Sequence, residues 1–399
     1  MCRFLCLFMV MLISFQGFAQ KKEISEARSS IKSRSNLEQA EASMRDLLKD
    51  EANRGNIKIY QTLADVVREQ YEVVNEKLYL KEQFDTASLF IIARKMFLTY
   101  QCLDSADMRP DKKGRVKLNF RKKNSEFLER YRRNLYNGGM FFIKKHDYGQ
   151  AYSMMDVYLD CERQPLFEEV ELDGALSSSA AFWTVFCGHK LCRPDSTLKY
   201  SDLALTNKKY RRRTLAYVAG AYLQKGDTLN YVKTLRQGFE ENKTSRFFFT
   251  RLMDYYNNAN SLDSAMNIVN TAVAADKDNI LFLFAKSNVL LNLGDYTGCI
   301  EISDSLIARN DTLADVYLNA GVSYLNLALS LEKDLKSRKQ NAKKILEYYK
   351  KALPYMERYR VLAPDAKEQW APSLYNIYLK LNMGKKFAEI SDVLRKMRK

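Results

Sequence analysis

The chain has 399 residues, of which 46% are hydrophobic and 12% aromatic, and this composition excludes a globally disordered protein. Only 6 Pro and 15 Gly are present, so long helices joined by short turns are favoured over a β-rich fold. The formal net charge of +16 predicts a strongly basic surface with affinity for polyanions, but charge alone does not choose between nucleic acid, anionic lipid and acidic protein.

The first residues have the pattern of a secretory signal peptide. An apolar run from Phe4 to Phe15 follows a single arginine, and Gly17 and Ala19 place small residues before a cleavage site. A membrane anchor is the alternative, but the run is shorter than the roughly 20 apolar residues that cross a bilayer. We therefore expect residues 1–19 to be a cleavable signal peptide and the mature chain to be periplasmic, with outer-membrane association as an open alternative.

Residues 20–104 form an N-terminal helical segment, because apolar residues such as Ile59 and Leu63 recur at helical spacing. We interpret this segment either as divergent helical hairpins or as a cap on the helices that follow. Residues 105–126 interrupt the pattern with a proline, a glycine and many Lys and Arg residues. They predict a basic linker that is exposed to solvent.

From about residue 212 to residue 321 the chain repeats itself with a period of 34 residues. Each repeat contains two stretches with apolar residues on one helical face, separated by a turn rich in Gly, Asp and Ser. This pattern predicts a series of helix pairs. The clearest column of equivalent positions is Leu215, Phe249, Leu283 and Tyr317.

These repeats resemble the tetratricopeptide repeat family, in an exported bacterial form. The resemblance covers residues 127–399 and implies an all-α fold: a right-handed superhelical solenoid of antiparallel helix hairpins. In this family the concave groove, lined by the first helix of each hairpin, binds peptides or partner proteins. One unit matches the family motif at Leu135, Gly138, Gly139, Phe142, Asp147, Tyr148, Ala151 and Met155.

The resemblance also implies which residues contact a partner, namely those on the groove-facing side of each first helix. The basic clamp with which chaperone-binding relatives hold acidic tails is absent, so that specificity is not carried over. The partner-binding positions implied in this sequence are Arg213, Phe247, Thr250, Asp254, Asn257, Phe284, Asn288 and Asn319.

One hairpin is expected to carry an insertion near residues 326–348. Because Leu327 and Leu331 keep a helical spacing and the insertion contains no Pro or Gly, both helices are predicted to be about two and a half turns longer. The tip between them is expected either to touch an anionic partner or membrane surface, or to be merely solvated. Its basic residues are Lys333, Lys336, Arg338, Lys339, Lys343 and Lys344.

No residue pattern in the chain predicts catalysis. Cys187, His189 and Cys192 lie close together, but zinc needs four ligands and no second pair follows them. We interpret the chain as a non-enzyme without metal or cofactor, acting as a protein–protein interaction scaffold of the cell envelope with a protein or peptide partner. The alternative is a basic polyanion-binding protein, directed at anionic lipid or glycolipid surfaces, or at nucleic acid if the signal-peptide prediction is wrong.

Overall fold

The computed structural model describes residues 20–111, 113–333 and 339–397, and within these ranges the regular structure is helical, with no strand. The predicted signal peptide therefore lies outside the described residues. The chain divides into two compact units, Met1–Tyr231 and Val232–Lys399, each of which is built from helices that pack on their neighbours in sequence. None of the helices in the described part combines the length and apolar character needed to span a membrane.

Unit 1 begins with helices that pack against each other around an apolar core. The face predicted from Ile59 and Leu63 is buried, at 0% and 3% exposure. Asp85 caps the helix that follows it, because its carboxylate accepts hydrogen bonds from the amides of Ala87 and Ser88. After a helical stretch at residues 20–33, the elements are α2 (Leu37–Leu47), η1 (Glu51–Asn53), α3 (Ile57–Tyr79) and α4 (Thr86–Asp107).

The predicted basic linker is shorter and better anchored than the sequence suggested. Helix α4 continues to Asp107, and α5 (Arg121–Lys144) begins inside the predicted linker. Arg121 is buried, and its Nε and Nη2 donate to the two carboxylate oxygens of Asp104 at 2.9 and 2.8 Å. The expectation of a wholly solvated connector was therefore wrong at Arg121, which is buried. A buried guanidinium needs an anionic partner, and the pairing with Asp104 joins the start of α5 to the end of α4.

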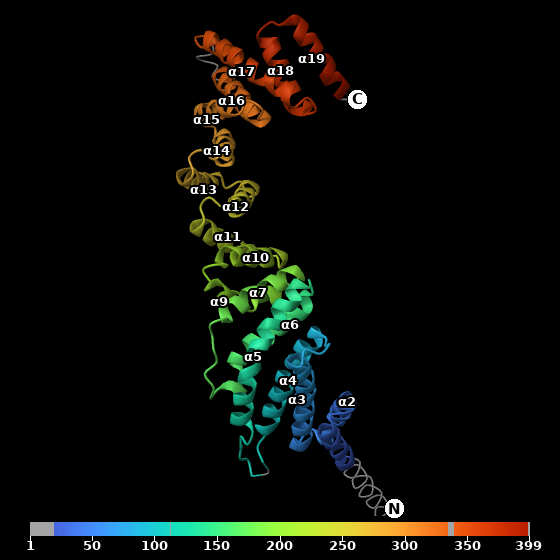
Figure 1. Cartoon of the computed structure of the whole chain (residues 1–399). Coiled ribbons are helices and arrows are strands. Elements are labelled where there is room, and N and C mark those ends of the chain that lie inside the picture. Colours follow the sequence, from blue (N-terminus) through green and yellow to red (C-terminus); the bar gives the residue numbers. More distant parts are fainter. Residues whose placement is uncertain (1–19, 112, 334–338, 398–399) are drawn as a thin grey trace, which may run out of the picture. The chain divides into compact units, whose positions relative to one another are not determined.

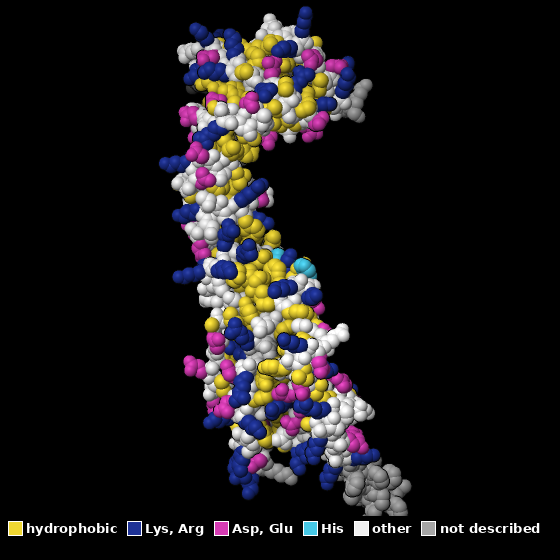
Figure 2. Space-filling model, in the orientation of Figure 1, with side chains coloured by type: hydrophobic (Ala, Val, Ile, Leu, Met, Phe, Trp, Pro, Cys, Tyr) yellow, Lys and Arg dark blue, Asp and Glu magenta, His cyan; other side chains and the backbone are white. Residues whose placement is uncertain are grey.

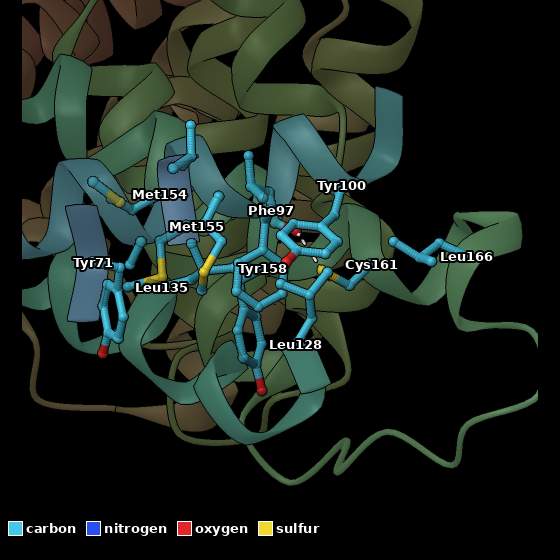
Figure 3. Close-up of a cluster of buried hydrophobic side chains, with 14 of the residues drawn as sticks. Tyr71, Phe97, Tyr100, Leu128, Leu135, Met154, Met155, Tyr158, Cys161 and Leu166 are labelled. Carbon is cyan, nitrogen blue, oxygen red and sulfur yellow. Dashed lines mark hydrogen bonds between the residues drawn. The ribbon is translucent and has the colours of Figure 1, made fainter. Parts of the chain in front are cut away.

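Unit 1 continues with two further hairpins, the second of which has a broken return helix. Figure 3 shows Phe97 and Tyr100 of α4 in the same cluster as Leu128 and Leu135 of α5 and Met155, and all five are buried. The remaining elements of the unit are α6 (Tyr148–Asp160), η2 (Cys161–Arg163), η3 (Pro165–Phe167), α7 (Ser177–Lys190), α8 (Pro194–Leu198), α9 (Ser201–Leu205) and α10 (Arg211–Gln224).

Small residues let the two helices of a hairpin approach closely. At Gly139 of α5, an added Cβ would lie 2.5 Å from the Cε of Met155 on α6, so only glycine fits without a shift of that side chain. This is the position at which the repeat motif also places a small residue. The α5–α6 pair is therefore a hairpin held by direct packing of one helix on the other.

Unit 2 contains the regular repeats, shown in Figure 1 as successive helix pairs. The residues of the repeat column that lie in this unit, Phe249, Leu283 and Tyr317, are all less than 9% exposed, as the 34-residue period predicts. Helix α11 (Thr228–Glu241) crosses the boundary between the units. The pairs that follow are α12 (Arg246–Asn258) with α13 (Leu262–Ala275), and α14 (Ile280–Leu293) with α15 (Tyr296–Arg309).

The predicted insertion lies in the longest hairpin of unit 2. Helices α16 (Ala314–Lys333) and α17 (Ala342–Leu362) have 20 and 21 residues, whereas α14 and α15 have 14 each. The described residues of the chain thus confirm an all-α fold made of helix hairpins, while the superhelical handedness stays a prediction. The last pair is α18 (Lys367–Lys380) and α19 (Gly384–Met397).

Candidate interaction surfaces

The predicted partner-binding residues of α12 lie along one side of that helix, because their spacing of three and four residues follows the helical turn. Asp254 and Asn257 are exposed, and Phe247 and Thr250 are half-buried. The Arg251 guanidinium carbon lies 3.7 Å from the centroid of the Phe247 ring, so a cation covers one ring face. This helix therefore presents a mixed aromatic and polar surface to solvent.

The predicted residues of α14 and α16 do not share one environment. Phe284 and Asn288 are half-buried, but Asn319 is only 5% exposed, and its amide donates to Ser287 Oγ at 2.9 Å and to Asn288 Oδ1. The prediction of a groove-facing Asn319 is corrected by this placement. One 34-residue period before Asn319 stands Ala285, not Phe284 or Asn288, so Asn319 faces the neighbouring hairpin instead of the solvent.

An apolar pocket of about 560 Å³ lies at the N-terminal ends of α12, α14 and α16. Of the predicted site residues only Phe284 lines it, so sequence reasoning missed the site. The available signal was the apolar character of residues at the starts of consecutive first helices, such as Ile280, which is 42% exposed. The lining residues are Thr244, Arg246, Asn279, Ile280, Leu281, Phe282, Phe284, Thr312, Leu313, Ala314, Asp315 and Val316.

The remaining predicted residue, Arg213, lies in unit 1, beside a cluster of aromatic side chains that the sequence analysis did not identify. The cluster joins three first helices, α5, α7 and α10, through rings that are half-buried. We call it, with two neighbouring cations, the aromatic–basic surface. Its members are Tyr136, Trp183, Phe186, His189, Tyr210, Tyr217, Lys209 and Arg213.

Ring contacts hold this surface in one arrangement. Tyr210 stacks on the buried Phe182 with centroids 4.0 Å apart and planes inclined by 7°. The His189 ring stacks on Tyr217 at 4.5 Å, and Trp183 meets Phe186 edge-on at 5.6 Å. Figure 2 shows hydrophobic and basic side chains around the two histidines on the face in view. The sequence signal that was missed is the helical spacing of Trp183 and Phe186 in α7, together with Tyr210 and Tyr217 at the N-cap and in the body of α10.

Electrostatic effects differ between the members of the aromatic–basic surface. Burial lowers the pKa of His189, with Lys190 as the second cause, so the imidazole is favoured in its neutral form. Burial raises the pKa of Tyr217, against the opposing charge of Arg213. Burial also raises the pKa of Tyr136, although a hydrogen bond with Trp183 acts in the opposite direction.

Cys187, His189 and Cys192, which are close together in the sequence, do not meet as a reactive centre. Cys187 is buried, and this raises the pKa of its thiol to about 12, which disfavours the thiolate that a nucleophile requires. The imidazole of His189 packs on Tyr217 instead. Cys192 is exposed, with a backbone φ of 53°, where α7 ends.

The predicted basic tip is described only in part. Lys333 at the end of α16, and Lys339, Lys343 and Lys344 around the start of α17, are exposed. Lys344 lies over the Tyr348 ring, with its Nζ 5.8 Å from the centroid. Two further predicted members, Lys336 and Arg338, lie outside the described residues.

Comparison with known proteins returned no matching family model and no matching curated sequence. Solved structures similar to this chain include the C-terminal part of a TPR repeat-containing protein from Cytophaga hutchinsonii, with 11% identity and a TM-score of 0.43, over 64% of this chain and 92% of that chain. A TPR repeats protein from Bacteroides fragilis matches with 17% identity and a TM-score of 0.33, over 64% and 97% of the two chains. A tetratricopeptide repeat protein from Parabacteroides merdae matches with 13% identity and a TM-score of 0.35, over 66% and 97%. These structures are of the repeat class that the sequence resembles.

Proposed function

We propose that the chain is a non-catalytic scaffold of the cell envelope that binds a protein or peptide partner on the solvent-exposed sides of its first helices, which line the groove expected for such a repeat. The observation that carries this proposal is the side of α12 that bears Phe247 and Asp254, which remains open to solvent although the opposite side of the helix is buried. In a helical repeat, one face of each helix is buried by packing on its neighbours, and the other face remains available for a ligand.

The chemistry of these surfaces suits recognition of another protein. Aromatic and arginine side chains dominate the energetics of protein interfaces, and Phe247 with Arg251 supplies such a pair on α12. The apolar pocket that Phe284 lines offers a recess for an apolar side chain of the partner. Protein binding therefore uses the features that the fold leaves unburied.

Co-purification from intact envelopes tests this function. A triple substitution of Thr250, Asp254 and Asn257 by arginine should remove the partner from the purified complex, because it changes charge and shape on the exposed side of α12 alone. A matched triple variant on second helices, at Asn267, Asn270 and Glu301, uses residues that are exposed on α13 and α15. If both variants keep or both lose the same partner, the first-helix face of α12 is not the binding surface.

The envelope location rests on the apolar run and the small residues at Gly17 and Ala19. N-terminal sequencing of the protein recovered from the periplasm should give Gln20 as the first residue. Recovery of a chain that still begins at Met1 from the cytoplasm would overturn the location and leave the scaffold function to be tested there.

The exposed lysines around the ends of α16 and α17 favour a second candidate function, the binding of an anionic envelope surface. Replacement of Lys343 and Lys344 by glutamate should weaken the association with isolated envelopes at low salt and have little effect at high salt, because exposed charges are screened. Association that is insensitive both to salt and to this substitution would exclude the tip as a binding element.

A further inference from the structure

Acidic residues are absent from α7, from α10 and from most of α5, the three first helices that carry the aromatic–basic surface. No Asp or Glu occurs in residues 130–146, 174–194 or 203–226, which include most of α5 and all of α7 and α10. The same ranges contain many Lys and Arg residues. These three ranges therefore carry positive charge without an acid of their own.

Some acids of the intervening segments are already engaged by cations of this chain. Asp156 of α6 accepts from Lys199 Nζ at 2.6 Å, and Glu162 accepts from Arg132 Nη2 at 2.6 Å. Neither Lys209 nor Arg213 forms an ion pair with any described residue, and both are exposed. These two cations are therefore available to a negatively charged ligand at the edge of an apolar cluster.

We propose that the aromatic–basic surface binds an acidic peptide segment that also carries apolar side chains, within a protein partner. The inference rests on the proposed scaffold function and names the chemistry of one ligand. Lys209 and Arg213 pair with carboxylates of the segment, and the half-buried Trp183 and Phe186 receive its apolar side chains.

A peptide fits this surface better than a single-stranded nucleic acid does. Nucleic acids need aromatic faces on which bases can stack. Here the Tyr210 ring already stacks on Phe182, with Lys209 Nζ 5.1 Å from its centroid, and the Tyr217 ring is covered by His189. Rings that stack on one another present mainly their edges, which suit apolar side chains.

Fluorescence provides a local readout, because the chain has only 2 Trp residues. Trp183 belongs to the surface, and Trp370 of unit 2 is 3% exposed, with its indole bonded to the carbonyl of Ala363. A full-length Trp370→Phe protein therefore reports on Trp183 alone. The ligand to be titrated into this protein is a short synthetic peptide in which glutamates alternate with phenylalanine and serine. In the control peptide every glutamate is replaced by glutamine.

The acidic peptide should change the Trp183 emission in a saturable and salt-sensitive manner, and the glutamine peptide should bind at least about tenfold more weakly. Lys209→Glu combined with Arg213→Glu should raise the Kd for the acidic peptide by about tenfold or more. The matched control is Lys277→Glu with Lys385→Glu, two exposed lysines of unit 2 that form no ion pair with a described residue. Thermal melting of each variant separates loss of binding from loss of folding.

Equal binding of the two peptides, or an unchanged Kd in the Lys209/Arg213 variant, would overturn the proposal. Tighter binding of oligothymidylate or of phosphatidylglycerol vesicles, with the same change in Trp183 emission, would overturn it in favour of nucleic acid or membrane. If the acidic peptide fails while envelope co-purification still depends on α12, the scaffold function stands and only the assignment of an acidic ligand is wrong.

Discussion

At the scale of single residues, Tyr256 of α12 shows how one repeat position stabilises unit 2. The ring is 3% exposed, and its hydroxyl accepts from Arg236 Nε at 2.5 Å. Tyr256→Ala leaves a cavity between packed helices and should lower the free energy of unfolding of unit 2 by about 3 kcal/mol. Lys277→Ala, at an exposed turn position, should change it by less than about 0.5 kcal/mol. Equal denaturation midpoints for the two variants would contradict this assignment of the repeat register.

The buried pair of Arg121 and Asp104 should show coupled effects on stability, because loss of either side chain leaves the other charge buried without its partner. Arg121→Ala leaves the Asp104 carboxylate buried without its cation and should cost about 3 kcal/mol in the free energy of unfolding. The double variant Arg121→Ala with Asp104→Ala should cost less than Arg121→Ala alone. Denaturant melts of the wild type and the three variants measure the coupling, and strict additivity of the two single effects would refute it.

His189 gives a pH-dependent contribution to stability. Burial lowers its pKa in the folded chain below the ordinary value of 6.5, so the unfolded chain binds more protons over that range. The contribution is present above about pH 6.5 and is lost as the pH falls through the folded pKa. His189→Gln should therefore lose less stability than the wild type between about pH 7.5 and 5.5. Identical slopes of melting temperature against pH would show that His189 titrates as freely as in the unfolded chain.

At the scale of helices, two mid-helix glycines should respond in opposite directions to an added methyl group. At Gly238 of α11 a Cβ would overlap the ring of Phe248, which is fully buried, so Gly238→Ala should destabilise unit 2 by about 1–3 kcal/mol. At Gly220 of α10 no atom lies within 4 Å of the added Cβ. Gly220→Ala should therefore stabilise by about 0.5–1 kcal/mol through the unfolded chain. Destabilisation of similar size at both sites would contradict the claim that the space around the added methyl group decides the effect.

The helices themselves could be predicted from the sequence, because the residues that they bury recur at equivalent positions in successive repeats. Phe249, Leu283 and Tyr317 are buried as that column requires, and the long α16–α17 hairpin follows from the apolar spacing of its insertion. Asn319 was misplaced because it lies two positions after Tyr317 and faces a neighbouring hairpin, where its amide is bonded to Ser287.

Features that depend on distant residues could not be predicted. The pairing of Arg121 with Asp104 requires that the end of α4 meets the start of α5, and no local sequence pattern predicts that contact. The aromatic–basic surface forms because α7 and α10 bring Trp183 and Tyr210 together across an intervening broken helix. The half-buried state of these rings is a tertiary property, since their spacing within each helix is equally suited to a core.

At the scale of the whole molecule, the net charge of +16 is distributed unevenly along the chain. In unit 1, residues 130–146 and all of α7 and α10 lack acids, whereas the segments between them hold acids, of which Asp156 and Asp195 are paired with lysines. Charge placed on one set of helices is a property of a binding face, whereas charge spread evenly mainly favours solubility. We therefore predict that partners are attracted to first helices and not to second helices.

Site-specific photo-crosslinking tests this central claim most directly. A photoreactive amino acid at Asp254 of α12, which is exposed on a first helix, should form a covalent adduct with the partner in intact envelopes. The same group at Asn270, which is exposed on the second helix of that hairpin, should form none. Adducts of equal yield at both positions, or adducts at Asn270 alone, would contradict a scaffold that binds its partner through the solvent-exposed sides of its first helices.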